Sequence, residues 1–351
     1  MRPTSSLTSI RLYAALAEME ILKMTNTCTE QTLSNSILVD ASRYLQIDRP
    51  QRIQPQLSVD ITGHCFQPHI DDLESDWVSH VAAPGFKVYC QLRGADVESF
   101  CSIGTGSGLD VLSAIEILGA TRVGLTDVHE DVVAAAAANI AHNQLAAYPV
   151  TIQSGFGDLL TPLVPYASRY DVIYENLPNI LSQDAETVAE EKNSSAYVPP
   201  RAEEVPQLIK QQMLDLHYLA LLQAKDFLKT DGAVLSCLGA RVPLDVFLSL
   251  GKLAGYTPSI LTYGWKVQGD PELIRDYAHN QASGFGPFYF YRAEVLQKAF
   301  AGLDAADTGR NALDIERSLQ TRRMDPLTAY AAFEDGERIA HTVAVLQCET
   351  K

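Results

Sequence analysis

A glycine-rich turn in the first third of the chain limits the possible folds more than any other stretch. The turn spans residues 100–110, Phe-Cys-Ser-Ile-Gly-Thr-Gly-Ser-Gly-Leu-Asp, and leads from a short apolar run into a segment, 109–118, with apolar residues at helical spacing. Gly104, Gly106 and Gly108 lack Cβ atoms, so the backbone can turn tightly and a ligand can lie against main-chain N–H groups. A strand, a glycine turn and a helix in this order predict an α/β fold with a site for a nucleotide-like ligand.

A carboxylate follows the next predicted strand. Arg122 to Thr126 reads as a strand and runs into Asp127. An acid about 20 residues beyond the last glycine is placed to accept two hydrogen bonds from a ribose diol. Asp127 can also cap the helix predicted from Glu130 to Ile140, and both roles can hold at once. These signals fit dinucleotides and S-adenosylmethionine alike.

Two further loops indicate which of these cofactors the chain binds. The strand Val150 to Ser154 runs into Gly155-Phe-Gly-Asp158, and the strand Tyr170 to Tyr174 runs into Glu-Asn-Leu-Pro-Asn at residues 175–179. With the four signals in this order, residues 90–295 resemble the class I S-adenosylmethionine-dependent methyltransferases. The resemblance implies an α/β fold with a Rossmann-like, doubly wound, mostly parallel sheet whose last strand is antiparallel.

The resemblance also implies the cofactor, S-adenosylmethionine, with S-adenosylhomocysteine as its product. Gly104, Gly106 and Gly108 would face the methionine part and the ribose, Asp127 would bind the ribose hydroxyls, and Asp158 would accept a hydrogen bond from the adenine amine. Asp158 can instead cap a turn. The expected cofactor set is completed by Ser102, Thr105, Val128, Gly157, Leu159 and Asn176.

One position departs from the family pattern. The family usually carries an acid two residues before the first glycine, near the methionine ammonium, and Ser102 stands there in this chain. The ammonium is then expected to be held by backbone carbonyls or by another acid such as Asp110.

The loop after the fourth strand carries the predicted chemistry. It is similar to the Asn-Pro-Pro-aromatic and Asn-Leu-Pro-aromatic loops of methyltransferases that act on nitrogen, in which the Asn carbonyl and the next backbone carbonyl orient the target amine. Methyl transfer needs in-line positioning and exclusion of water. Asn176 is the expected positioning residue, and Tyr174, Glu175, Pro178 and Tyr197 are the other catalytic candidates. The loop can alternatively be a rigid turn that ends a strand.

The substrate is expected to be a small molecule. Asn179 stands where enzymes of this type that act on nucleobases carry an aromatic that stacks on a flipped base. A net charge of −16, with no concentrated basic run, also opposes nucleic acid. The long segment 181–205 predicts a lid. Expected substrate contacts are Phe66, Tyr197, Arg201, Tyr263 and Trp265, although the last two also fit core aromatics.

Other activities stay open. A protein side chain, or an oxygen, sulfur or carbon acceptor, is the alternative to a nitrogen of a metabolite or natural product. Oxygen normally requires a general base, and His217, the one histidine placed near the sheet, is expected to pack in a helix. A non-catalytic protein that binds S-adenosylmethionine is the other class.

The remaining chain is predicted to flank a core over 91–295. Residues 1–90 are expected to form a helical extension and cap, with helices at Leu7 to Met24 and Gln31 to Leu45 that cover the active site or build a homodimer face. Residues 296–351 are expected to form a C-terminal helical extension with a strand near His341 to Gln347. No metal is expected, because His64, His69, Asp71 and Asp72 match no metal signature.

Composition favours a cytoplasmic protein. Its six cysteines show no paired spacing, and no apolar run approaches about 18 residues, so neither a disulfide framework nor a membrane span is expected. Within the core, the other expected elements are a helix over 204–229, a strand over 233–238, a helix over 244–254, a strand over 257–267, a helix over 272–279 and a last strand over 287–293.

Overall fold

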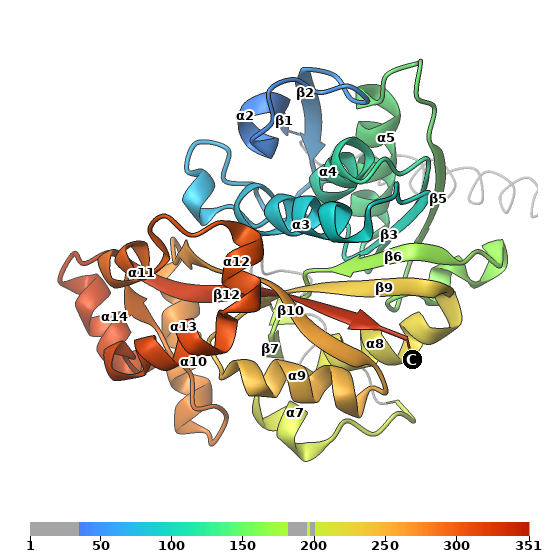
Figure 1. The fold of residues 1–351 in the computed structure, drawn as a ribbon. Coiled ribbons are helices and arrows are strands. Elements are labelled where there is room, and N and C mark those ends of the chain that lie inside the picture. The colour runs from blue at the N-terminus through green and yellow to red at the C-terminus, as the bar shows by residue number, and fades with distance from the viewer. Residues whose placement is uncertain (1–34, 182–194, 197–200, 351) are drawn as a thin grey trace, which may run out of the picture.

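The computed structural model describes residues 35–181, 195–196 and 201–350, which are built around one central sheet (Figure 1). Its strands lie in the order β10, β12, β9, β6, β3, β4, β5, and a short β11 pairs with β12. Their bounds are β3 Ser99–Ile103, β4 Arg122–Asp127, β5 Thr151–Phe156, β6 Tyr170–Glu175, β9 Leu228–Gly239, β10 Thr257–Val267, β11 Tyr291–Arg292 and β12 Ile339–Glu349.

The pairing confirms the predicted fold class. The neighbours from β9 through β6, β3 and β4 to β5 are parallel, whereas β12 is antiparallel to both β9 and β10. The chain builds β3, β4 and β5 outward in one direction and then crosses to β6 on the other side of β3. The sheet is therefore doubly wound and mostly parallel, with an antiparallel last strand.

The identity of that last strand corrects the prediction. Residues 287–293 were expected to form it, but only Tyr291–Arg292 are in β-structure. The last strand is β12, and it is inserted between β9 and β10, where almost all of its side chains are buried. Its run of apolar residues suits a strand covered on both faces. The C-terminal segment thus supplies both the expected helices and an interior strand of the sheet (Figure 1).

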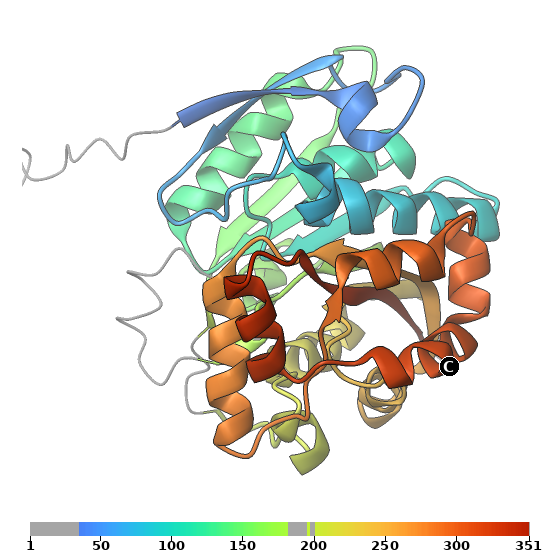
Figure 2. The same ribbon diagram turned by 90° about the vertical axis from the view of Figure 1, so that its left-hand side faces the viewer.

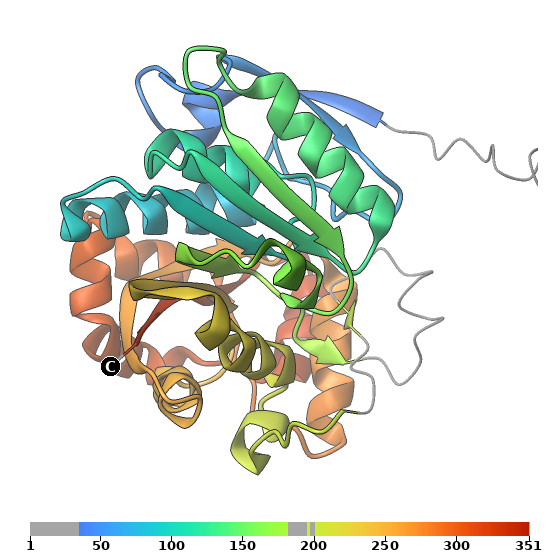
Figure 3. The same cartoon turned by 90° about the vertical axis from the view of Figure 1, so that its right-hand side faces the viewer.

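Helices cover both faces of the sheet, as Figures 2 and 3 show from the two sides. Alternate residues of β6 enter different cores: Val172 and Tyr174 pack with α3, α4 and α5, whereas Ile173 packs with α8 and α9. This alternation follows from the two-residue period of a strand. The helices are α3 Ala83–Arg93, α4 Leu109–Ile117, α5 Glu130–Asn143, α8 Asp215–Phe227 and α9 Leu244–Leu253.

The N-terminal region differs from its prediction. Instead of one helix over Gln31 to Leu45, residues Asn35–Asp40 form β1, which pairs antiparallel with β2 (Gln56–Ile61), and only Ala41–Leu45 are helical, as α2. A strand results because Val39 and Ile37 alternate with exposed residues. β2 lies along α5, where the Asn143 side chain bonds to the backbone of Ser58 (Figure 2). The helix predicted over Leu7 to Met24 lies outside the described residues.

The predicted long helix over 204–229 is also divided. It forms α7 (Gln207–Gln211) and α8, separated at Gln212 to Leu214, where Met213 has a φ of 54°.

After β10, a helical layer precedes β12, and its first member confirms the helix expected at 272–279. The members are α10 Pro271–Ala282, α11 Ala293–Phe300, α12 Ala305–Arg310, α13 Ala312–Leu319 and α14 Pro326–Glu334.

Short elements complete the described part of the chain: η1 Leu73–Ser75, η2 Val78–Ala82, η3 Thr161–Tyr166, η4 Gln320–Arg322 and the small pair β7 Ile180–Leu181 and β8 Ser195–Ala196. Among the helices of this part, none combines the length and the apolar character needed to cross a membrane.

Candidate functional site

A cavity of about 250 Å³ follows the carboxyl edge of the sheet. β10 runs parallel to β9, since both are antiparallel to β12, so the ends of β3, β6, β9 and β10 and the start of β12 meet at this edge. The chain reverses its winding between β3 and β6, which is where ligands bind in open α/β sheets. One end of the cavity is lined by Gly104, Thr105, Gly106, Ser107 and Asp110, the middle by Tyr174 and residues 176–180, and the other end by Arg241, Lys266, Gln268, Tyr277 and His341.

The glycine turn forms the first wall of the cavity. Gly104, Gly106 and Gly108 have φ values of 69°, 49° and 81°, which other residues rarely adopt. Added Cβ atoms would lie 3.3 Å from the Leu177 side chain at Gly104 and 3.3 Å from the Ala136 carbonyl at Gly108. Glycine therefore suits the turn at all three positions and also allows the close packing at Gly104 and Gly108. Gly104, Thr105 and Gly106 line the cavity, while Gly108 caps α4 against α5.

Asp110 is a buried acid in contact with Ser102, the residue that stands where the family pattern has an acid. Ser102 is fully buried, and its hydroxyl donates a hydrogen bond to Asp110 Oδ2. Asp110 is itself 5% exposed and lines the cavity, and its Oδ1 accepts a hydrogen bond from the Val111 N–H at 2.8 Å. Burial raises the pKa of Asp110 to about 7. A negative charge can thus be presented to the cavity from the start of α4 rather than from β3.

Asp127 lies just behind the glycine turn. Its Oδ2 accepts a hydrogen bond from the Gly106 N–H at 3.4 Å and its Oδ1 one from the His129 N–H at 3.2 Å. Burial raises the pKa of Asp127. The residue that precedes α5 is His129, so Asp127 orders the turn before the helix instead of capping it. Val128 beside it is 64% exposed.

Asp158 lies beyond the end of β5, where Gly157 and Leu159 both have positive φ values. Its Oδ1 accepts a hydrogen bond from Arg201 Nη1 and its Oδ2 one from Gln223 Nε2, each at 3.1 Å. Arg201 also pairs with Glu203 at 3.0 Å. Arg201, expected at the substrate, is therefore placed against Asp158, and it is not among the residues that line the cavity.

The loop after β6 forms the middle of the cavity. Tyr174, Asn176 and Pro178 line it, and the Asn176 side chain is half-buried. Glu175 does not line it: its carboxylate is fully buried, lies 2.8 Å from His217 Nδ1 and accepts a hydrogen bond from the Leu177 N–H at 3.2 Å. This pair fixes the start of the loop, so that Asn176 faces the cavity.

The expected substrate residues are dispersed. Phe66 lines the cavity and is 46% exposed, and Tyr197 lies outside the described residues. Tyr263 and Trp265 face away from it: Tyr263 packs on Phe300 and Trp265 meets the His80 ring edge-on. Because neighbouring side chains of a strand point to opposite faces, Lys266 faces the cavity instead.

A cationic end of the cavity was not predicted. Arg241, two residues beyond β9, and Lys266, near the end of β10, are each 6% exposed. Lys266 stands directly opposite His341 in the β10 and β12 ladder. The sequence does contain a signal for this end, because Lys266 and His341 are polar residues within apolar strands. The signal was not used, because the prediction did not place β12 beside β10. The other members of this end are Trp77, Gln268 and Tyr277.

The positive charges here are only partly compensated. Arg241 donates hydrogen bonds to Gln268 Oε1 at 2.6 Å and to the Tyr277 hydroxyl at 3.4 Å, while its Nε has no partner in the structure as described. Lys266 lies 5.3 Å from the Trp77 ring centre. Burial, with Arg241 nearby, lowers the pKa of Lys266 to about 8, and burial with both cations lowers that of His341.

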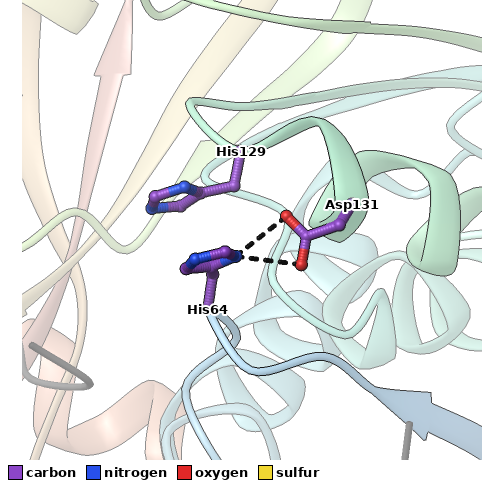
Figure 4. A group of neighbouring side chains, drawn as sticks. All are labelled: His64, His129 and Asp131. Atoms are coloured by element: carbon purple, nitrogen blue, oxygen red, sulfur yellow. Dashed lines mark hydrogen bonds and ion pairs between the residues drawn. The ribbon is translucent and has the colours of Figure 1, made fainter. Parts of the chain in front are cut away.

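A group of His64, His129 and Asp131 lies outside the cavity, at the start of α5 (Figure 4). His64 Nδ1 lies 3.0 Å from Asp131, and the two imidazole rings stack with centroids 4.5 Å apart and planes 7° apart. A ligating nitrogen lone pair lies in the plane of its ring, and two parallel planes do not meet at one ion. The arrangement is that of a stacked histidine pair held by an aspartate.

Comparisons with known proteins give distant structural likenesses only. No family model matches this chain, and no curated protein matches it. Among solved structures, the ribosomal protein L11 methylase from Lactobacillus delbrueckii subsp. bulgaricus shares 16% identity and a TM-score of 0.37 over 64% of this chain and 90% of that one. A putative RNA methyltransferase from Pyrococcus horikoshii shares 12% identity and a TM-score of 0.38 over 78% and 85%.

A third likeness is to the 16S rRNA N2 G1207 methyltransferase of T. thermophilus in complex with AdoMet and guanosine, with 13% identity and a TM-score of 0.36 over 59% of this chain and 43% of that one. Such distant likenesses carry no conclusion about activity. The strand order and the direction of β12 are properties of this chain itself. By these, the chain has the doubly wound, mostly parallel sheet with an antiparallel last strand that its resemblance to the class I S-adenosylmethionine-dependent methyltransferases implies.

Proposed function

We propose that this chain is an S-adenosylmethionine-dependent methyltransferase that methylates a nitrogen of a small molecule. The observation that carries the proposal is the meeting of the glycine turn and the Asn176 loop in one cavity at the switch point of the sheet. Gly104 lies against Leu177, so a ligand on the turn has Asn176 beside it. A binding loop and a loop of positioning groups in contact are what group transfer requires.

The cofactor would lie across the ends of β3, β4 and β5. Its ribose would face Asp127, held beside the Gly106 N–H, and its adenine would lie near Asp158. Asp110 would accept the methionine ammonium, because it is the buried carboxylate at the glycine-turn end of the cavity. When bound, the cofactor supplies an electrophilic methyl group on sulfur with a neutral thioether as leaving group.

The chain's own contribution would be placement. The Asn176 side-chain carbonyl and a neighbouring main-chain carbonyl would accept hydrogen bonds from the acceptor amine and direct its lone pair at the methyl carbon. The methyl group would leave sulfur as the new N–C bond forms, and the electron pair of the broken C–S bond would remain on sulfur. The amine must enter uncharged or lose a proton to solvent. The buried pair of Glu175 and His217 would keep the loop in this geometry.

A small acceptor is favoured by the size of the cavity, about 250 Å³, and by its buried, polar far end. The net charge of −16 opposes nucleic acid. A protein side chain, or an acceptor atom other than nitrogen, is the alternative activity. A cofactor-binding protein without catalysis is the alternative class.

Asn176→Ala tests the proposal. The purified protein would be given methyl-labelled S-adenosylmethionine and a cell extract, and the label separated into acid-soluble, protein and nucleic-acid fractions. Wild type is expected to label the acid-soluble fraction, and Asn176→Ala to lose at least about 100-fold of this activity with cofactor Kd nearly unchanged. Asn280→Ala is the control, because Asn280 lies on α10 but is not among the residues that line the cavity. Unaltered turnover in Asn176→Ala, or label in protein or nucleic acid alone, would contradict it.

A further inference from the structure

The far end of the cavity contains two buried cations that the chemistry of methyl transfer does not require. Arg241 and Lys266 both line it, and each is 6% exposed. A buried charge is costly unless it is paired. Within the part of the chain that the structure describes, neither side chain is within ion-pair distance of a carboxylate, since Arg241 bonds to Gln268 and Tyr277 and Lys266 to the Val267 carbonyl.

Asp76, an acid that also lines the cavity, forms no ion pair with these cations in the described part of the chain. Asp76 is buried beside Lys266, but both of its oxygens already accept hydrogen bonds: Oδ1 from the Tyr44 hydroxyl and the Ser79 N–H, each at 2.8 Å, and Oδ2 from the His69 N–H at 3.0 Å. Asp270 also lines the cavity, and its Oδ1 accepts a hydrogen bond from the Glu272 N–H at 2.8 Å. In the described part of the chain, both carboxylates are thus held by backbone or hydroxyl donors and neither forms an ion pair with Arg241 or Lys266.

The donors are arranged around an open space. The Arg241 Nε–H has no partner, although its atom is buried. Gly239 permits this placement, because a Cβ there would overlap Arg241 Nη1 and would come within 3.7 Å of His341. Lys266 and His341 face the same space as cross-strand neighbours. Guanidinium and ammonium donors that converge in a cavity are suited to a carboxylate, which accepts hydrogen bonds on two oxygens.

We propose that Arg241 and Lys266 bind a carboxylate of the methyl acceptor, so that the substrate is a carboxylic acid. This inference rests on the proposed function, because only a methyltransferase has a methyl acceptor. The wall beside the cations is formed by Trp77, Tyr277 and Leu273, which suits an apolar or aromatic body attached to the acid. Asn176, between this end and the glycine turn, then meets the opposite end of the same molecule.

The position of Lys266 argues against the other source of a carboxylate, the methionine part of the cofactor. Neighbouring strands lie about 4.8 Å apart, so the ends of β3 and β10, separated by three intervening strands, are about 19 Å apart. A cofactor anchored at β4 and β5 with its ammonium at Asp110 does not extend to Lys266. The acceptor half of the cavity does.

The test uses benzoate, with neutral benzamide as its matched control. Trp77 lies 5.3 Å from Lys266 Nζ, so its fluorescence reports this end of the cavity, and a Trp265→Phe background removes the other tryptophan, which faces away. Benzoate is expected to change the emission saturably with S-adenosylhomocysteine bound, and benzamide at equal concentration is not. If the protein binds S-adenosylhomocysteine but not benzoate, this inference is overturned and the proposed function stands.

Variants locate the site. Arg241→Met and Lys266→Met, checked for folding by circular dichroism, are each expected to weaken benzoate at least about tenfold while the Kd of S-adenosylhomocysteine stays within about twofold. Lys225→Met, which removes a cation over Tyr256 away from the cavity, is the control and is expected to change neither.

Competition separates the two sources of the carboxylate. Displacement of benzoate by S-adenosylhomocysteine would assign the cations to the cofactor and overturn the inference. Methyl label found only in neutral or cationic metabolites after anion exchange of the acid-soluble fraction would also overturn it, while confirming methyl transfer. Absence of S-adenosylhomocysteine binding with benzoate binding intact would remove the proposed function alone and leave an anion site.

Discussion

The hydroxyl of Ser102 donates a hydrogen bond to the carboxylate of Asp110 across the glycine turn. The strand end therefore carries the donor, and the helix start carries the acid. Because Asp110 reaches the cavity from α4, the missing acid at position 102 does not remove the negative charge from the place where a methionine ammonium would lie. At the start of α4 the carboxylate of Asp110 is also buried, and this burial raises its pKa to about 7.

Asp110→Asn is expected to weaken S-adenosylmethionine binding by about 10 to 100-fold, which corresponds to the loss of one buried charge-assisted contact. Titration calorimetry measures this. Ser113→Ala is the matched control, because Ser113 lies on the same helix and its hydroxyl donates only to the Leu109 carbonyl at 2.6 Å. Equal affinities in wild type and Asp110→Asn would remove Asp110 from the cofactor site.

The same carboxylate sets a pH dependence. Its pKa in the free protein is about 7, so protonation removes the charge below that pH, and cofactor affinity is expected to fall by up to tenfold per unit as the pH drops from 7 to 5. An acid whose pKa is raised by folding costs stability once the pH exceeds its unfolded value. Asp110→Asn is therefore expected to lose the pH dependence of binding and to be no less stable than wild type at pH 8 in urea unfolding.

Gly108 tests the backbone requirement of the turn. Gly108→Ala is expected to destabilise the fold by about 1 to 3 kcal/mol from the left-handed φ of 81°, with an added loss from contact with the Ala136 backbone at 3.3 Å. Gly94→Ala isolates the first contribution, because Gly94 has a φ of 66° and open space around it. Urea unfolding of both should show the larger loss at Gly108. A larger loss at Gly94 would contradict the packing argument.

The buried pair of Glu175 and His217 is expected to act as one unit. Removing one member leaves the other in an apolar interior, so His217→Leu and Glu175→Leu should each cost about 3 to 5 kcal/mol. The double variant should lose less than the two single losses combined. Glu175→Leu alone also frees the Leu177 N–H and should lower turnover. Strictly additive losses in the unfolding free energy would show that the pair is not coupled.

The sequence predicted the loops at the carboxyl ends of β3, β4 and β6 because their signals are local. A glycine turn, an acid after the second strand and a polar loop after β6 each lie within a few residues of a strand end, and the parallel order of the strands brings them together. Asp127 and Asn176 lie at the ends of β4 and β6, where the sequence placed them. Elements with a strong period, such as β10 and α5, were also predicted closely.

The far end depends on a contact that local pattern does not contain. Lys266 and His341 become neighbours only because β12 enters the sheet after the helices α10 to α14. With the last strand assigned to residues 287–293, His341 had no partner and Lys266 had no reason to face a cavity. The prediction chose Tyr263 and Trp265 on the same strand because they are large aromatics. Side chains alternate along a strand, so these two lie on the face opposite to Lys266.

Anion binding at this far end should depend on pH in the opposite sense from cofactor binding. Burial and Arg241 lower the pKa of Lys266 to about 8, while Asp76 and Asp72 on the neighbouring segment oppose this shift. His341 and His69, which also face this space, have lowered pKa values and stay neutral above pH 7, and Arg241 keeps its charge. Of these groups at the far end of the cavity, Lys266 is thus the one that titrates above pH 7.

The protonated ammonium binds the anion, so the Kd of benzoate is expected to be nearly constant between pH 6.5 and pH 7.5 and to rise by up to tenfold per unit above about pH 8. Benzoate itself stays ionised throughout this range. Lys266→Met should bind benzoate more weakly and with no dependence above pH 8, and Trp77 fluorescence measures both. Lys266→Arg should restore affinity and extend the constant range upward, because a guanidinium does not lose its proton there. A pH profile that is unchanged in Lys266→Met would show that another group controls binding.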